Sequence, residues 1–144
     1  MAEGFARAYG ADVLDPCSAG LGPAPAMPAL TIQTMQEKNI DLSEAFPKGL
    51  DAIPREGIEL IVNLTGSPLP TRLRTPVEQW DVRDPIGQSE KVYRQVRDEI
   101  EARVMDLILT TRFANGGGRR PAAPAPEAAR PRSRFDIRPG RFRQ

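Results

Sequence analysis

The strongest candidate for a catalytic residue in this sequence is Asp84, the aspartate of an Asp84-Pro85 pair. The 144 residues contain no histidine, so general acid and base work falls to carboxylates. Taken alone, Asp-Pro is a common turn dipeptide, and the turn interpretation is favoured. Asp81, three residues earlier, is the second carboxylate candidate, although a solvated loop position fits it better. Acid catalysis at Asp84 therefore needs support from the surrounding sequence.

Cys17 is the only cysteine and hence the only thiol nucleophile to consider. A Cys-x5-Arg phosphate-binding loop would need arginine at position 23, where the chain has Pro23. No helix follows Cys17 at once to lower the pKa of its thiol. We therefore expect Cys17 to be a small, partly buried residue at a strand end and not a nucleophile.

Composition also restricts which metal sites, membrane-spanning segments and cellular locations we expect. One thiol and no histidine leave too few ligands for a zinc site, and we expect no cofactor. The single cysteine cannot form an internal disulfide, which indicates a cytoplasmic location. We find neither an apolar run long enough for a membrane span nor a signal-peptide pattern.

The charges divide the chain in two. Residues 1–114 contain 12 Lys/Arg and 17 Asp/Glu, whereas residues 115–144 contain 8 Arg and 2 acids. The second region is rich in Pro, Ala and Arg with little to bury, which predicts a disordered tail. Such a tail could contact a polyanion, but a solvated extension is the favoured interpretation. The first region has the length of one compact domain.

The order of predicted elements is typical of an α/β domain. The near-continuous apolar run at 58–64 is the strongest strand signal and indicates a strand covered on both faces. The expected elements are a helix over 2–9, a short strand over 11–14, a helix from 28 to about 39, strands over 58–64 and 77–80, and a helix from 89 to about 112. We expect Ile32 and Met35 on the inner face of the second helix. Trp80 and Tyr93 could flank a substrate mouth, but core packing is favoured.

Three short motifs occur in a telling order: Met-Ala-Glu-Gly at 1–4, Ser-Ala-Gly at 18–20 and Asp-Pro-Ile-Gly at 84–87. Together they resemble the low-molecular-weight protein tyrosine phosphatase family, which includes a branch of arsenate reductases. The resemblance implies a small doubly wound, parallel four-stranded sheet in strand order 2-1-3-4. It also implies that Asp84 is the general acid and base.

The same resemblance implies that a first, central strand and a Cys-x5-Arg-Ser loop precede the Met-Ala-Glu-Gly stretch. Neither is present in this sequence. We therefore expect an N-terminally truncated phosphatase-like domain over 1–114 that lacks its central strand and is inactive alone. The true start of the protein is left open.

Three functions remain open from the sequence. The first is hydrolysis of phosphomonoesters by a cysteinyl-phosphate mechanism, with a phosphotyrosine-bearing protein or a small phosphate or arsenate oxyanion as partner. The alternative is an arsenate reductase that uses a single cysteine and an external thiol. The stretch at 64–70 contains no cysteine, which argues against the thioredoxin-coupled subtype. The third is a non-catalytic fragment whose basic tail serves binding.

Overall fold

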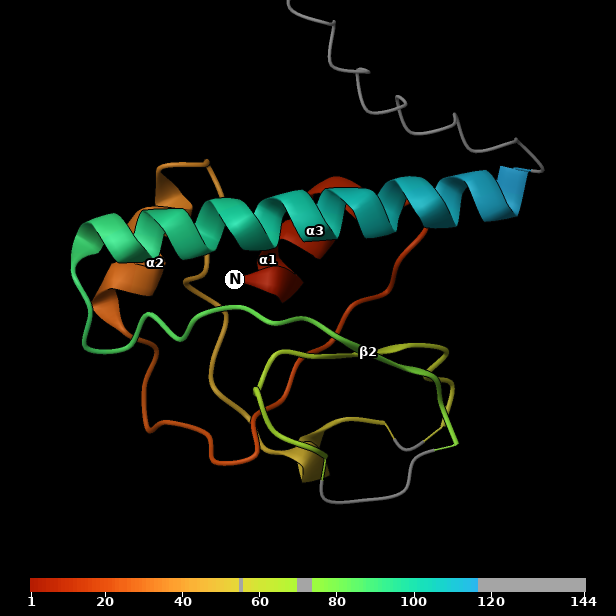
Figure 1. The fold of residues 1–144 in the computed structure, drawn as a ribbon, viewed down its shortest axis with the longest axis horizontal. Coiled ribbons are helices and arrows are strands. Elements are labelled where there is room, and N and C mark those ends of the chain that lie inside the picture. Colours follow the sequence, from red (N-terminus) through yellow and green to blue (C-terminus); the bar gives the residue numbers. More distant parts are fainter. Residues whose placement is uncertain (55, 70–73, 117–144) are drawn as a thin grey trace, which may run out of the picture.

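The computed structural model describes residues 1–54, 56–69 and 74–116. Figure 1 shows the long helix α3 crossing the molecule, with α1 and α2 packed against it and the strands and loops below. The elements in chain order are α1 (Ala2–Gly10), α2 (Ala29–Gln36), the 3-10 helix η1 (Leu50–Ala52), β1 (Ile61–Asn63), β2 (Val77–Gln79) and α3 (Glu90–Gly116). Most of the predicted tail lies outside the described residues.

The core is built mainly between α3 and the two shorter helices. Residues of α3 that recur at helical spacing form its inner stripe, and Phe5 of α1 and Met35 of α2 are fully buried against it. Gly10 lets α1 approach closely, because a Cβ there would lie 2.7 Å from Cγ1 of Ile108. The buried α3 residues are Tyr93, Val96, Arg97, Ile100, Val104 and Ile108.

Two arginines of α3 fasten it to α2 through one carboxylate. Arg94 donates to Glu37 from Nε at 3.0 Å and from Nη2 at 2.8 Å. The buried Arg97 donates to Glu37 Oε2 at 2.6 Å and to the Thr34 carbonyl at 2.9 Å. The hydrogen bonds from Arg94 and then Arg97 lower the pKa of Glu37 to about 2. Glu37 is thus the charged partner that both guanidinium groups share, while Arg97 also pairs with Asp98 and Arg94 with Glu90.

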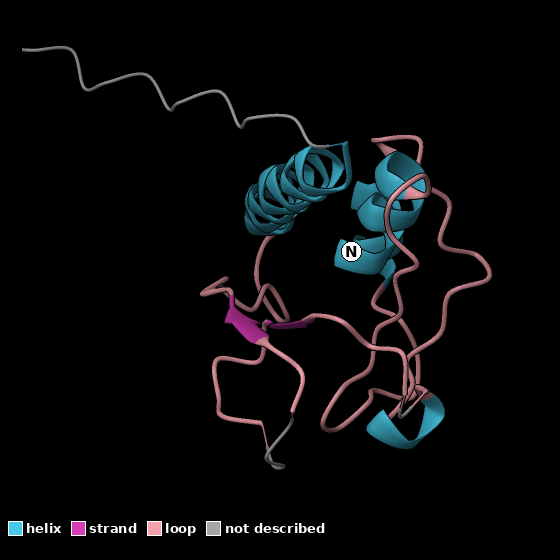
Figure 2. Cartoon of the chain, turned by 90° about the vertical axis from the view of Figure 1, so that its right-hand side faces the viewer, coloured by secondary structure: helices cyan, strands magenta, loops and turns pink. Residues whose placement is uncertain are grey.

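The strands form a parallel pair in which Ile61, Val62 and Asn63 lie opposite Val77, Glu78 and Gln79. Figure 2 shows this pair set apart from the helices, with η1 on the other side of the molecule. The structure bears out an α/β fold with a small parallel sheet. Among the described residues the sheet has two strands, not the four implied by the resemblance.

The strand predicted at 11–14 is wrong. These residues continue α1 as a turn, because the amides of Val13 and Leu14 both donate to the Gly10 carbonyl, at 2.9 and 2.8 Å. The last carbonyls of a helix lack partners within the helix, so they accept hydrogen bonds from the amides of a short run that follows. Strand-like pairing occurs later instead, where Gly20 forms a parallel bridge with Gly49.

Three details of the helices also differ from expectation. α2 ends at Gln36, and the chain turns through Asn39 with a left-handed φ of 59°. Ile32 is 39% exposed, so the prediction that it faces inward is wrong, while Met35 is buried as expected. α3 extends four residues beyond the predicted end at Arg112, and Tyr93 and Trp80 are core residues.

We expect acid to weaken the fold partly through Glu37. Its folded pKa of about 2 lies below the ordinary value of 4.5, so its stabilising effect is complete above about pH 4.5 and is lost as the pH falls through 2. Glu37→Gln removes the charge and should flatten the fall in unfolding free energy between these limits, measured by urea denaturation at successive pH values. Glu44→Gln changes an exposed carboxylate outside this network and should leave the profile unchanged. A wild-type profile for Glu37→Gln would contradict the role of this carboxylate.

Candidate functional site

Asp84 lies in a closed turn between β2 and α3. Its Oδ1 accepts a hydrogen bond from the Ile86 amide at 3.0 Å, and the Gln88 amide donates to the Pro85 carbonyl at 2.9 Å. Gly87 adopts a φ of 74°, which favours glycine. The sequence therefore folds this loop locally around the aspartate, as its Asp-Pro-x-Gly pattern favours.

The turn leaves one carboxylate oxygen of Asp84 available. Asp84 is exposed, and no partner among the described residues contacts Oδ2. Arg83 donates to the side-chain oxygen of Gln88 at 2.9 Å, which closes the loop across its base. A carboxyl group held by one oxygen and free at the other can exchange a proton with a bound molecule without reorganising its loop.

A shallow hollow lies where both strands end. It measures about 450 Å³, and its lining residues are Gly66, Ser67, Pro68, Gln79 and Asp81. The side chain of Asp81 is exposed, and its carbonyl accepts a hydrogen bond from Arg103 at 3.0 Å. The carboxyl ends of parallel strands are where open α/β sheets bind ligands. Asp81 therefore belongs to the same edge of the sheet as the loop that carries Asp84.

The buried Asn63 organises this edge, and sequence reasoning missed it. Its amide nitrogen donates to the Ser67 carbonyl at 2.8 Å, and its Oδ1 accepts from the Thr65 amide at 3.0 Å and the Thr65 hydroxyl at 2.8 Å. An asparagine at a strand end followed two residues later by threonine is a signal for such a turn. The side chain thus shapes the loop that lines the hollow.

Glu3 ties the start of α1 to two distant segments. Its carboxylate contacts Arg7 at 2.9 Å and Lys48 at 3.4 Å, and it accepts a hydrogen bond from the Ser18 hydroxyl. Burial alone would raise the pKa of Glu3, but Ser18, Arg7 and Lys48 hold it below its usual value. No local sequence pattern could have predicted this cluster, because its members lie up to 45 residues apart.

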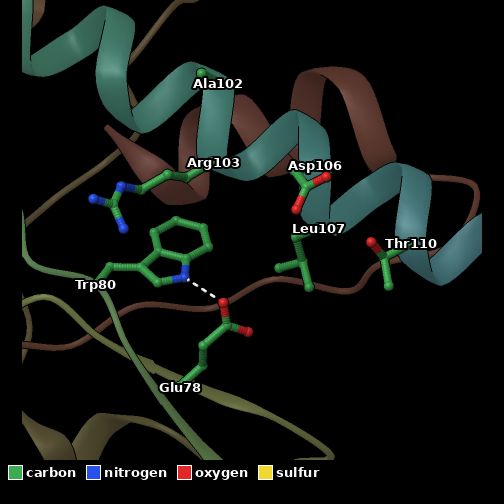
Figure 3. Close-up of a pocket in the computed structure, with 7 residues that line it drawn as sticks. All are labelled: Glu78, Trp80, Ala102, Arg103, Asp106, Leu107 and Thr110. Atoms are coloured by element: carbon green, nitrogen blue, oxygen red, sulfur yellow. Dashed lines mark hydrogen bonds between the residues drawn. The ribbon is translucent and has the colours of Figure 1, made fainter. Parts of the chain in front are cut away.

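A second hollow, of about 510 Å³, lies between β2 and α3 and is drawn in Figure 3. Trp80 forms its inner wall, with the indole nitrogen donating to Glu78 at 2.8 Å, while Arg103, Asp106 and Thr110 project from the helix. Trp80 is only 4% exposed, which confirms the prediction that it packs in the core.

The structure also places Cys17, and the described residues can be searched for metal ligands and membrane-spanning helices. Cys17 is exposed and outside any strand, so the expectation of a partly buried strand end is wrong. The residues that the structure describes contain no group of three or more acidic or cysteine side chains able to hold a metal. No helix among them is both long and apolar enough to cross a membrane.

Comparison with known proteins identifies the family that this chain matches and several proteins that it resembles. The model of the family described as low molecular weight phosphotyrosine protein phosphatase matches residues 1–115. A glutaredoxin arsenate reductase from Synechocystis sp. is 34% identical over 112 residues, covering 75% of this chain and 85% of that protein. A putative arsenate reductase from Halobacterium salinarum is 31% identical over 98 residues, covering 67% and 69%. A solved arsenate reductase in the phosphate binding state has a TM-score of 0.69 and 32% identity, covering 76% and 86%.

Asn63→Ala should loosen the loop that lines the hollow. It removes three hydrogen bonds and should destabilise the chain by about 1–3 kcal/mol, with faster hydrogen exchange at the Thr65 amide. Asn63→Asp keeps the acceptor for Thr65 but loses the donor to Ser67, so it should protect the Thr65 amide better than alanine does. Exchange measured by NMR and urea denaturation check this, and equal Thr65 exchange in wild type and Asn63→Ala would contradict it.

Proposed function

Because the chain belongs to the low molecular weight phosphotyrosine protein phosphatase family, we propose that it provides the acid side of an arsenate-reducing site. The observation that supports this most directly is Asp84, held by the Ile86 amide at Oδ1 and free at Oδ2 in an exposed loop. The relatives reported above are named arsenate reductases. Similarity thus favours the reductase alternative over hydrolysis of aryl phosphates.

The role proposed for Asp84 is to protonate the departing oxygen. A thiolate sulfur bonds to the arsenic of arsenate, and one arsenate oxygen, already carrying a proton, leaves as water with the proton of Asp84. A second thiol then attacks that sulfur. The electron pair of the sulfur–arsenic bond stays on arsenic, which yields arsenite and a disulfide.

The two thiols are not assigned to residues of this sequence. Cys17 is exposed and lacks the arginine that a Cys-x5-Arg loop requires at position 23. The stretch at 64–70, of which residues 66–68 line the hollow, contains no cysteine, so we propose that the second thiol is external. The Synechocystis relative is named a glutaredoxin arsenate reductase, which supports a thiol of that kind. A cytoplasmic location stays a prediction that fits such a reductant.

The substrate proposed is a small tetrahedral oxyanion. A relative solved in a phosphate binding state supports this class. A phosphotyrosine-bearing protein is the competing substrate, because the family model carries the phosphatase name. The two possibilities differ in the product that appears, arsenite or inorganic phosphate.

The decisive experiment uses the protein purified from its own cells, with its intact mass recorded. We expect arsenite to form from arsenate when glutathione and glutaredoxin are supplied. Asp84→Asn, introduced at the native locus, should lower the rate about 10²-fold or more, because the departing oxygen then lacks its acid. Asp41→Asn changes another exposed aspartate whose Oδ1 accepts a backbone amide, outside the lining of the hollow, and as the matched control it should retain near wild-type turnover.

Three results would redirect the proposal. Phosphate release from an aryl phosphate without arsenite formation would favour the phosphatase. Equal losses in Asp41→Asn and Asp84→Asn would contradict the specific role of Asp84. No turnover of either substrate, from a protein whose mass equals that of these 144 residues, would favour the non-catalytic alternative with its basic tail.

A further inference from the structure

We propose that the outer edge of β2, the side facing away from β1, docks residues 134–138 of this same chain as an added strand. The charged side chains of that segment would enter the hollow of about 510 Å³ between β2 and α3. This inference goes beyond the arsenate chemistry, since it concerns backbone pairing and surface charge and is tested without an oxyanion.

The register of the strand pair shows that β2 has an open edge. The Pro76 carbonyl and the Trp80 amide bond to β1, each at 2.9 Å. Because successive peptide groups of a strand alternate in direction, the amides and carbonyls of Val77 and Gln79 point away from β1. Within the described part of the chain, no backbone hydrogen bond reaches these outward groups. The order 2-1-3-4 implied by the resemblance counts β2 as its fourth strand, so no strand of that sheet lies beyond this edge.

The hollow beside this edge presents charges of both signs and an aromatic wall. Glu78 gives one carboxylate oxygen to the indole nitrogen of Trp80 at 2.8 Å, and its second oxygen has no partner among the described residues. Arg103 and Asp106 project from α3 toward the same hollow (Figure 3). Carboxylates beside an aromatic ring suit the guanidinium group and the apolar stem of an arginine.

The run at 134–138, which lies outside the described residues, has the sequence pattern of a strand. It reads Arg-Phe-Asp-Ile-Arg, so charged and apolar residues alternate with a period of two. In a strand, one face would carry Arg134, Asp136 and Arg138, and the other would carry Phe135 and Ile137.

Both faces of such a strand would find complementary surroundings at this edge. The two arginines of its charged face would meet the carboxylates of Glu78 and Asp106, and its aspartate would meet Arg103. Its apolar face would lie beside Val77, which is 48% exposed. Residues 1–114 contain 12 Lys/Arg and 17 Asp/Glu and residues 115–144 contain 8 Arg and 2 acids, so the two regions also attract each other overall.

The rest of the basic region suits the edge poorly. Proline cannot donate to a ladder, and glycine weakens a strand. Between residues 117 and 144, the longest stretch without either residue runs from 132 to 138. The alternating run is therefore the segment of this region best suited to pair with β2.

The end of α3 lies within easy reach of the hollow. Thr110 lines the hollow, and α3 ends six residues later at Gly116, about 9 Å along the helix axis. The 18 residues from 116 to 134 can span up to about 60 Å when extended. A tether of this kind gives an effective concentration on the order of 1 mM, so even weak pairing would keep the edge occupied.

Hydrogen exchange of the outward amides, followed by NMR on the full chain, tests the docking. Replacing both Asp136 and Ile137 by proline removes one amide of each orientation from the added strand. The amides of Val77 and Gln79 should then exchange about tenfold faster than in the wild type. The matched control, Ala128→Pro with Ala129→Pro, changes the same region outside the run and should exchange like the wild type.

The charged face is tested by a variant of β2. Glu78→Gln keeps an acceptor for the indole of Trp80 and removes the charge, so it should speed exchange of the Val77 amide about threefold at low salt. Salt at about 1 M should produce a similar change in the wild type. Glu44→Gln removes an exposed charge outside the hollow and should have no effect.

Four outcomes would overturn the proposal. The first is equal exchange of the Val77 and Gln79 amides in the wild type and the variant with prolines at 136 and 137. The second is faster exchange of equal size in the alanine-to-proline control. The third is unchanged exchange in Glu78→Gln at low salt. The fourth is protection that rises with protein concentration together with a dimeric mass by light scattering, because a second copy would then supply the strand. None of these results depends on whether arsenite is formed.

Discussion

The indole of Trp80 joins the strand pair to the helices. Among the described residues it is the only buried hydrophobic side chain between Leu42 and Tyr93. Its ring packs in the same cluster as residues of α1 and α3, while its amide donates to Asn63 at the end of β1. The polar nitrogen of the ring is satisfied by Glu78, so burial leaves no unpaired donor. One residue therefore fixes where both strands end.

The loop with Asp84 depends on that position. It begins four residues after Trp80, and α3 begins at Glu90, so a core residue and a packed helix hold its two ends. Within these limits the hydrogen bonds of Oδ1 and Arg83 hold the turn closed. In the role proposed for Asp84, a carboxyl group held in this way would lose little freedom on protonating a departing oxygen, because its position is set before the substrate binds.

Sequence reasoning succeeded where a signal was local and long, and failed where a contact was distant. The apolar stripe of α3 follows from its helical periodicity and the strand near Ile61 from a near-continuous apolar run, and both appear in the structure. The run at 11–14 also contains apolar residues, but its amides bond to the last carbonyl of α1, which would otherwise lack a partner. The order of short motifs identified the family and the loop with Asp84. The cluster of Glu3 with Ser18 and Lys48 could not be predicted, because only folding brings these residues together.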